Sequence, residues 1–143
     1  MSDANKLVVR EFFGGIFSAG DLDVVHEYLA ADYVDHSPFA SEAPGPEGFR
    51  RRMEMLRSGL AVRMTLDDLV AEGDRVAFRW TMTGRHVGEF AGIAPTGRPV
   101  SLTGLNFERV ADGKIVEHWS EYDRLALIEQ VSGPDGAGAA GSP

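Results

Sequence analysis

The feature that most constrains the fold of this chain is a hairpin signal, Asp112-Gly113, near its C-terminal end. Asp and Gly are residue types that tolerate the positive φ angles of a tight turn. The segments on either side, residues 100–110 and 114–123, have the composition of long strands. We therefore expect these two segments to pair as antiparallel neighbours in a sheet.

The second of these strands carries ionisable side chains on both of its faces. Side chains alternate with a period of two along a strand, which separates Ile115, Glu117, Trp119, Glu121 and Asp123 from Val116, His118, Ser120 and Tyr122. Neither face is apolar enough for a plain core strand. A sheet that curls around a pocket explains the pattern, because one face then meets a cavity while the other meets solvent or a partner subunit.

Asp123, at the end of this strand, has two interpretations. Close to Trp119 it is a candidate acid-base group beside an apolar wall. At the start of a helix near Arg124 it is an N-cap residue, because Asp is favoured at that position. The strand by itself favours neither interpretation over the other.

Composition argues against several classes of function. The chain has 143 residues, enough for one domain with its own core, and without cysteine it forms neither a disulfide nor a thiolate metal site. A net charge of −8 argues against a nucleic-acid partner, since the one basic cluster, Arg50-Arg51-Arg52, is short. The N-terminus is polar and no apolar run is long enough to span a membrane, so we expect a cytoplasmic protein that binds no membrane.

Helical spacing of apolar residues predicts three helices in the first half of the chain, at residues 3–18, 22–30 and 46–58. The first contains Gly14-Gly15, so either another backbone passes close to it or the helix is kinked there. Alternating patterns then predict strands at residues 62–71, 75–84, 100–110 and 114–123, followed by a last helix at 124–131.

Helices followed by long strands are the order of an α+β domain with its helices on one face of the sheet. We expect an α+β cone or barrel, in which the N-terminal helices pack on a strongly curved antiparallel sheet and a short helix ends the domain. This single domain is predicted to cover residues 1–131. Residues 132–143 are rich in Gly, Ala and Pro and are expected to be disordered.

Two histidines are candidate pocket residues, because histidine titrates in the range that suits acid-base work. His36 follows Asp35, which would help to orient it, and His86 precedes a glycine-rich connection between strands. Each could instead lie at the surface or at a sheet edge. The four histidines of the chain form no pair at the spacing of a helical zinc site, so no metal is expected, and His26 and His118 are interpreted as structural or surface residues.

Five motifs carry a resemblance to a known family. They are Tyr33-Val34-Asp35-His36 after two helices, residues 71–76 (AEGDRV), residues 83–90 (TGRHVGEF), residues 95–98 (PTGR), and residues 112–119 (DGKIVEHW) followed by Asp123. Together, over residues 5–131, the sequence resembles the SnoaL-like polyketide cyclases of the nuclear-transport-factor-like and ketosteroid-isomerase-like cone superfamily. The motifs are specific to the broad family and much less so to one reaction.

The resemblance implies a cofactor-free intramolecular aldol condensation of a small, hydrophobic, polyketide-like substrate. The family's acid-base aspartate matches Asp123, and two family histidines match His36 and His86. The residues expected to contact substrate are Tyr33, Phe49, Met53, Trp80, Asn106 and Trp119. The surplus of apolar residues on the strands favours a homodimer or a higher homo-oligomer. The alternatives are another isomerase or hydrolase that uses the same pocket, and a non-catalytic module for ligand binding or dimerisation.

Overall fold

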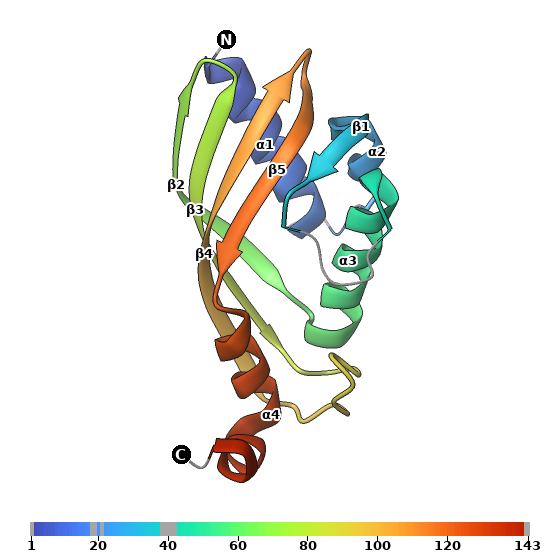
Figure 1. Cartoon of the computed structure of the whole chain (residues 1–143), viewed down its shortest axis with the longest axis vertical. Coiled ribbons are helices and arrows are strands. Elements are labelled where there is room, and N and C mark those ends of the chain that lie inside the picture. Colours follow the sequence, from blue (N-terminus) through green and yellow to red (C-terminus); the bar gives the residue numbers. More distant parts are fainter. Residues whose placement is uncertain (1, 18–19, 21, 38–42, 142–143) are drawn as a thin grey trace.

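One curved sheet with helices on its concave side makes up the fold (Figure 1). The computed structural model describes residues 2–17, 20, 22–37 and 43–141, with side chains as far as Ser132. The helices are α1 (Ser2–Phe17), α2 (Val24–Tyr28), α3 (Gly45–Leu60) and α4 (Arg124–Gly141), and the strands are β1 (Leu29–Asp35), β2 (Arg63–Glu72), β3 (Arg75–Arg85), β4 (Pro99–Ala111) and β5 (Lys114–Tyr122). The prediction of an α+β cone is confirmed.

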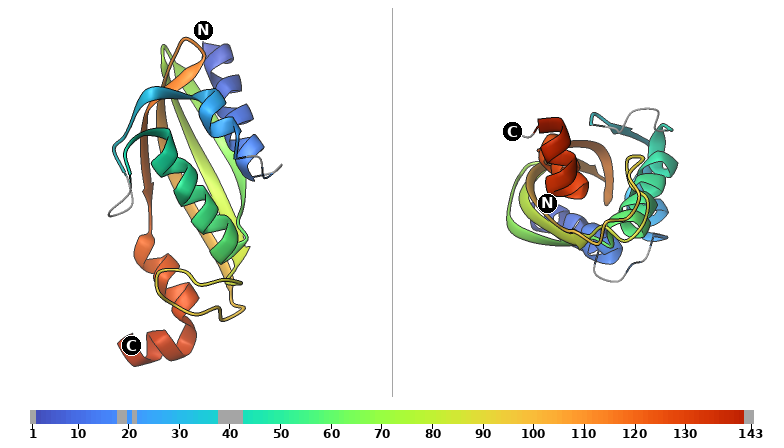
Figure 2. Two further views of the ribbon diagram at one scale, coloured as in Figure 1. Left: turned by 90° about the vertical axis from the view of Figure 1, so that its right-hand side faces the viewer. Right: turned by 90° about the horizontal axis from the view of Figure 1, so that it is seen from below.

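The strands lie in the order β1-β5-β4-β3-β2, and the sheet is open, with β1 and β2 at its edges. Seen from below, the sheet curves around the side on which α1 and α3 lie (Figure 2). The predicted hairpin is confirmed: β4 and β5 are antiparallel, Ala111 pairs with Lys114, and Asp112 and Gly113 both have positive φ. Because of this curvature, one face of the sheet is covered by the helices and the other face is exposed to solvent.

The first strand, β1, departs from the predicted antiparallel sheet. The helix predicted to reach residue 30 ends at Tyr28, and the chain continues as β1, which pairs with β5 in parallel. Leu29 and Tyr33 are buried in this strand. A five-residue helix is too short to be stable by itself, so the long-range pairing with β5 decides where the helix ends.

One of the two glycines in α1, Gly15, lies at a close contact with α2. The helix is continuous through both, so there is no break at this point. A Cβ atom on Gly15 would lie 3.0 Å from Cγ1 of Val24, the first residue of α2. The close neighbour of Gly15 is a side chain and not a backbone, and a Cβ atom on Gly14 would meet nothing within 4 Å, so neither predicted explanation accounts for both glycines.

The last helix, α4, is longer than predicted, since it runs past residue 131 to Gly141. Residues 142–143 lie outside the described part of the chain, and the domain boundary at residue 131 stays a prediction. No helix in the described part is both long and apolar enough to span a membrane.

Candidate active site

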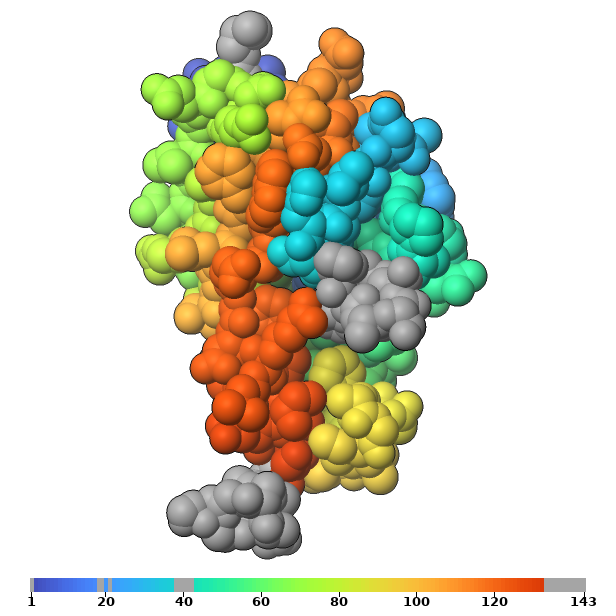
Figure 3. Space-filling model, viewed as in Figure 1, coloured from blue at the N-terminus to red at the C-terminus, as the bar shows by residue number. Residues whose placement is uncertain are grey.

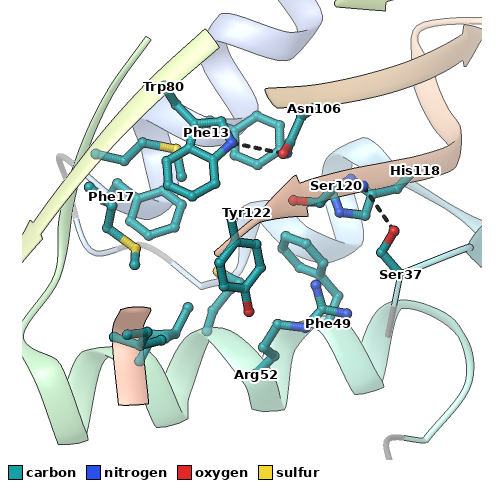
Figure 4. Close-up of a pocket in the computed structure, with 15 residues that line it drawn as sticks. Phe13, Phe17, Ser37, Phe49, Arg52, Trp80, Asn106, His118, Ser120 and Tyr122 are labelled. Atoms are coloured by element: carbon teal, nitrogen blue, oxygen red, sulfur yellow. Dashed lines mark hydrogen bonds between the residues drawn. The ribbon is translucent and has the colours of Figure 1, made fainter. Parts of the chain in front are cut away.

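A mainly apolar cavity lies between the concave face of the sheet and the helices α1, α3 and α4 (Figure 4). Its volume is about 50 Å³, and its lining residues are Phe13, Phe17, Ser37, Phe49, Arg52, Met53, Leu56, Met64, Trp80, Met82, Asn106, His118, Ser120, Tyr122 and Leu127. Aromatic rings and three methionines make up most of the wall. The few polar groups come from β4, β5, α3 and the end of β1.

The surface side of this cavity lies where β1, β5 and α4 meet, a face of the molecule that is seen in Figure 3. A polar depression there shares Ser37, Ser120 and Tyr122 with the cavity. The backbone N–H of Ser120 donates a hydrogen bond of 3.0 Å to Oγ of Ser37, which joins the ends of the two strands. These residues therefore separate the cavity from solvent.

His118 and Glu108 form a buried pair beside the cavity. They are direct partners in the register of β5 and β4, and their side chains are 3% and 1% exposed. Nδ1 of His118 lies 2.9 and 2.8 Å from the two carboxylate oxygens of Glu108. Because Nδ1 is engaged in this way, Nε2 is the ring nitrogen that can meet a ligand.

Two opposed effects set the acidity of His118. Burial lowers the pKa of the imidazole, whereas the Glu108 carboxylate, its hydrogen bond and the charge of Asp35 raise it. The second group of effects is the larger, and the pKa of His118 is raised above its ordinary value. The imidazole therefore holds its proton more firmly than a histidine in water.

A second buried pair, Arg52 and Asp35, lies next to the first. Nη2 of Arg52 donates to Oδ2 of Asp35, and the two side chains are 7% and 8% exposed. Asp35 also accepts hydrogen bonds from the Tyr33 hydroxyl at 3.2 Å and from the Ser37 N–H at 2.8 Å. Burial raises the pKa of Asp35, but His118, Arg52 and the hydrogen bonds outweigh burial and lower it.

Trp80 and Asn106 extend the hydrogen bonds of the His118–Glu108 pair into the apolar part of the cavity. Nε1 of Trp80 donates a hydrogen bond of 2.8 Å to Oδ1 of Asn106, and Asn106 in turn hydrogen-bonds the carboxylate of Glu108. Since the Asn106 oxygen accepts from Trp80, its NH₂ group is the donor to Glu108. The orientations of the indole, the amide and the carboxylate therefore depend on one another.

The indole of Trp80 reaches Asn106 only because Gly104 has no side chain. Trp80 and Gly104 are partners in the register of β3 and β4, and a Cβ atom on Gly104 would lie 2.2 Å from Cζ2 of the indole. A glycine inside a strand is a signal of such a close approach.

We expect Gly104→Ala to displace Trp80, break its hydrogen bond to Asn106 and lower the free energy of unfolding by about 1–3 kcal/mol. Urea denaturation and near-ultraviolet circular dichroism measure the two effects. Gly14→Ala is the matched control, because a Cβ atom at Gly14 meets nothing within 4 Å, and it should raise stability by about 0.5–1 kcal/mol. Equal stability of the Gly104→Ala variant and the unaltered protein would show that the indole has another place to lie.

The family model of the SnoaL-like polyketide cyclases matches residues 7–131. The chain belongs to the SnoaL-like polyketide cyclase family. The resemblance seen in the sequence is thereby confirmed.

Several characterised relatives and solved structures are similar to this member of the family. The aklanonic acid methyl ester cyclase DauD of Streptomyces sp. (strain C5) is 32% identical over 113 residues, which cover 78% of this chain and 68% of DauD. The nogalonic acid methyl ester cyclase of Streptomyces nogalater is 29% identical over 121 residues, which cover 82% and 90% of the two chains. The structure of TsrD from Streptomyces laurentii has a TM-score of 0.81 at 32% identity and covers 92% of this chain and 97% of TsrD.

The structure places four of the nine predicted site residues of this SnoaL-like protein in the cavity wall, namely Phe49, Met53, Trp80 and Asn106. Tyr33 lies one layer behind the wall, where its ring packs against Phe49 and His118. Contact of these residues with a substrate stays a prediction.

Asp123 is not part of the cavity wall. Its Oδ1 accepts a hydrogen bond of 2.9 Å from the backbone N–H of Ala126, so it caps the start of α4, and its side chain is exposed. This geometry corresponds to the helix-cap interpretation of the sequence. The cap explains why an aspartate is placed there without any catalytic task, and an acid-base role of Asp123 stays a prediction.

The remaining three predicted residues also lie away from the cavity. His36 stacks on Trp119, with ring centroids 4.5 Å apart, and its Nε2 lies 2.8 Å from a carboxylate oxygen of Glu117. Trp119 also packs against Phe107, which is 40% exposed, so this cluster lies on the solvent side of the sheet. His86 is fully buried and contacts Thr96, with 3.0 Å between Nδ1 and Oγ1.

His118, interpreted from the sequence as a structural or surface residue, is buried and lines the cavity together with Arg52. The buried partners of these two residues are Glu108 and Asp35. No sequence pattern pointed to Arg52 or Glu108. Alternation does place His118 on one face with Ser120 and Tyr122, but the direction in which the sheet curls decides which face is enclosed.

No set of three or more His, Asp or Glu side chains in the described part of the chain is arranged as metal ligands. The site is therefore best described as an apolar cavity with two buried charge pairs at one end.

Proposed function

We propose that this protein is a polyketide cyclase that closes a carbon ring in a hydrophobic substrate by intramolecular aldol addition, with His118 as the group that moves the proton. One observation carries the proposal: a buried histidine faces an apolar cavity while a buried carboxylate fixes its other ring nitrogen. The names of the relatives, which are cyclases of polyketide methyl esters, suggest the class of substrate.

The proposed reaction has two proton transfers that use the same atom. Nε2 of neutral His118 accepts the proton of a carbon that lies between two carbonyl groups. The electron pair left on that carbon forms a bond to a ketone carbon of the same molecule, and the π electrons of the ketone move to its oxygen. His118 then returns the proton to this oxygen, so that the product is an isomer of the substrate.

Glu108 supports both transfers without exchanging protons with the substrate. Its carboxylate holds the Nδ1–H of His118 and stabilises the imidazolium that forms after the first transfer. Acid-base catalysis by a positioned side chain contributes about 10²- to 10⁴-fold to a rate. Holding the two reacting carbons together in a narrow cavity adds to this, because it replaces a loss of entropy in solution.

Arg52 is placed to stabilise the negative charge that develops on the substrate. Its guanidinium lines the cavity near His118 and remains charged throughout the reaction. A cation that is fixed by Asp35 before the substrate arrives needs little reorganisation to favour an enolate or alkoxide oxygen. We assign to Asp123 the role of helix cap in this proposal.

The walls of the cavity can adapt to a polycyclic ligand. Met53, Met64 and Met82 lie in the lining, and methionine has three rotatable side-chain bonds and tolerates changes of packing. Rotation of these side chains would widen the present cavity of about 50 Å³ without a change in the sheet.

The test is incubation of the purified protein with aklanonic acid methyl ester or nogalonic acid methyl ester, followed by chromatography with mass detection. A new species of unchanged mass is the expected product. If the substrate binds in the cavity and no isomer forms, the protein is a ligand-binding module and the proposal is wrong.

The rate should depend on pH through His118. Because its pKa is raised, the neutral base form appears only as pH rises above the usual value, about 6.5. We therefore expect kcat/KM to increase with pH, with a midpoint above that value. Glu108→Gln removes the negative charge and should move the midpoint to lower pH; an unmoved midpoint would show that another group controls the rate.

A further inference from the structure

A second pocket lies behind the cavity, where the end of α1, the last turns of α3 and the start of β2 meet. Its volume is about 290 Å³, near the lower end of the range for small-molecule sites. It is lined by Ile16, Phe17, Gly20, Leu22, Met53, Arg57, Ala61, Val62 and Arg63. We call it the arginine pocket, and the reaction proposed above does not use it.

The arginine pocket has an apolar inner wall and two positively charged residues at its exposed side. Ile16, Phe17 and Met53 are buried and form an apolar inner wall, whereas Arg57 and Arg63 are exposed. Among the described residues of the lining there is no carboxylate. The described part of the lining thus carries two positive charges and no negative one, in a chain with a net charge of −8.

The backbone explains how the two arginines come together. Arg57 lies in the last turn of α3, and Arg63 is the first residue of β2. Between them Ala61 ends the helix with a φ of 48°, a left-handed conformation that turns the chain directly into the strand. Nη2 of Arg57 donates a hydrogen bond to the carbonyl of Gly20, which holds this guanidinium at the side of the pocket.

The arginine pocket and the cavity are neighbours with a common wall. Phe17 and Met53 line both of them, whereas Met64 and Met82 line only the cavity. A ligand in the arginine pocket would therefore contact Met53 but not Met64 or Met82.

We propose that the arginine pocket binds an organic anion with an apolar body, its carboxylate or phosphate head on Arg57 and Arg63 and its body against Ile16, Phe17 and Met53. Guanidinium groups bind carboxylates and phosphates through paired N–H donors. A neutral ester makes no such contact, so the arginine pocket differs from the cavity in the charge of its ligand.

The experiment uses octanoate, octyl phosphate and methyl octanoate as probes of the protein labelled with ¹³C at its methionine methyl groups. Octanoate or octyl phosphate should shift the signal of Met53 and leave Met64 and Met82 unmoved. Methyl octanoate should not produce this selective shift of the Met53 signal. The two anions distinguish a site for carboxylates from one for phosphates, and a shift by either supports the proposal.

Variants identify the groups that bind the head of the ligand. Arg57→Gln with Arg63→Gln should weaken binding of the anion about ten-fold or more, since hydrogen bonds between a guanidinium and an anionic head group are among the stronger ones. Arg63→Gln alone should weaken it less, and it leaves the bond between Arg57 and Gly20 in place. The matched control, Arg50→Gln with Arg51→Gln on the same helix, changes the net charge equally and should leave binding unchanged.

Three results would overturn the proposal: equal affinity for octanoate and its methyl ester, unchanged affinity in the Arg57 and Arg63 variants, or shifts of Met64 and Met82 with octanoate. The His118→Gln variant should bind the anions normally. Failure of this proposal is thus separate from failure of the cyclase reaction, which is measured by product formation.

Discussion

Replacement of His118 by Gln is expected to lower kcat about 10²- to 10⁴-fold, the usual contribution of a positioned acid-base group. Gln is similar in size, and its amide can still donate to Glu108, but it cannot accept and return a proton at neutral pH. The affinity for substrate should therefore change little while the rate falls. Steady-state kinetics and a binding titration on the same variant measure the two quantities.

Asp123→Asn is the decisive control for this prediction. Asn is as good an N-cap residue as Asp, so the variant should keep the bond to the Ala126 N–H and leave kcat unchanged. Asp123→Ala should cost about 1 kcal/mol of stability through loss of the cap. If Asp123→Asn abolishes turnover and His118→Gln does not, the aspartate is the acid-base residue and our assignment of His118 is wrong.

Much of the fold could be predicted because its signals are local. The strands β2 and β3 have clear alternation of apolar and polar residues, and the positive φ angles at Asp112 and Gly113 follow from the residue types. The parallel strand β1 was harder to predict, since its partner β5 lies more than eighty residues further along the chain. Its extended backbone is fixed by that partner and not by its own composition.

The candidate site was less predictable because it depends on which face of the sheet is enclosed. Side chains at Glu117 and Trp119 differ from those at His118 and Ser120 only by one step of the alternation. The sequence of a strand does not determine the direction in which the sheet curves. That direction follows from how α1 and α3 pack on the sheet. The buried pairs of Arg52 with Asp35 and of Glu108 with His118 also join residues from different elements.

The largest expected effect on stability comes from removing one member of a buried charge pair. Arg52→Met should lower the free energy of unfolding by about 3–5 kcal/mol, because it leaves the Asp35 carboxylate buried without its cation. The hydrogen bonds from Tyr33 and Ser37 and the charge of His118 remain, but none of them replaces the direct ion pair with Arg52. Urea denaturation at neutral pH measures the loss.

A double variant separates the loss of the cation from the loss of packing. Asp35→Asn with Arg52→Met removes both charges and keeps an oxygen that accepts from Tyr33, so it should be more stable than Arg52→Met alone. Its stability should also vary less with pH. In the unaltered protein the pKa of Asp35 is lowered, so ionised Asp35 stabilises the fold above the pKa of an unfolded aspartate, about 3.9, and this contribution is lost as pH falls through the folded value. If the destabilisation by the two changes is simply additive, the charges of Arg52 and Asp35 do not interact.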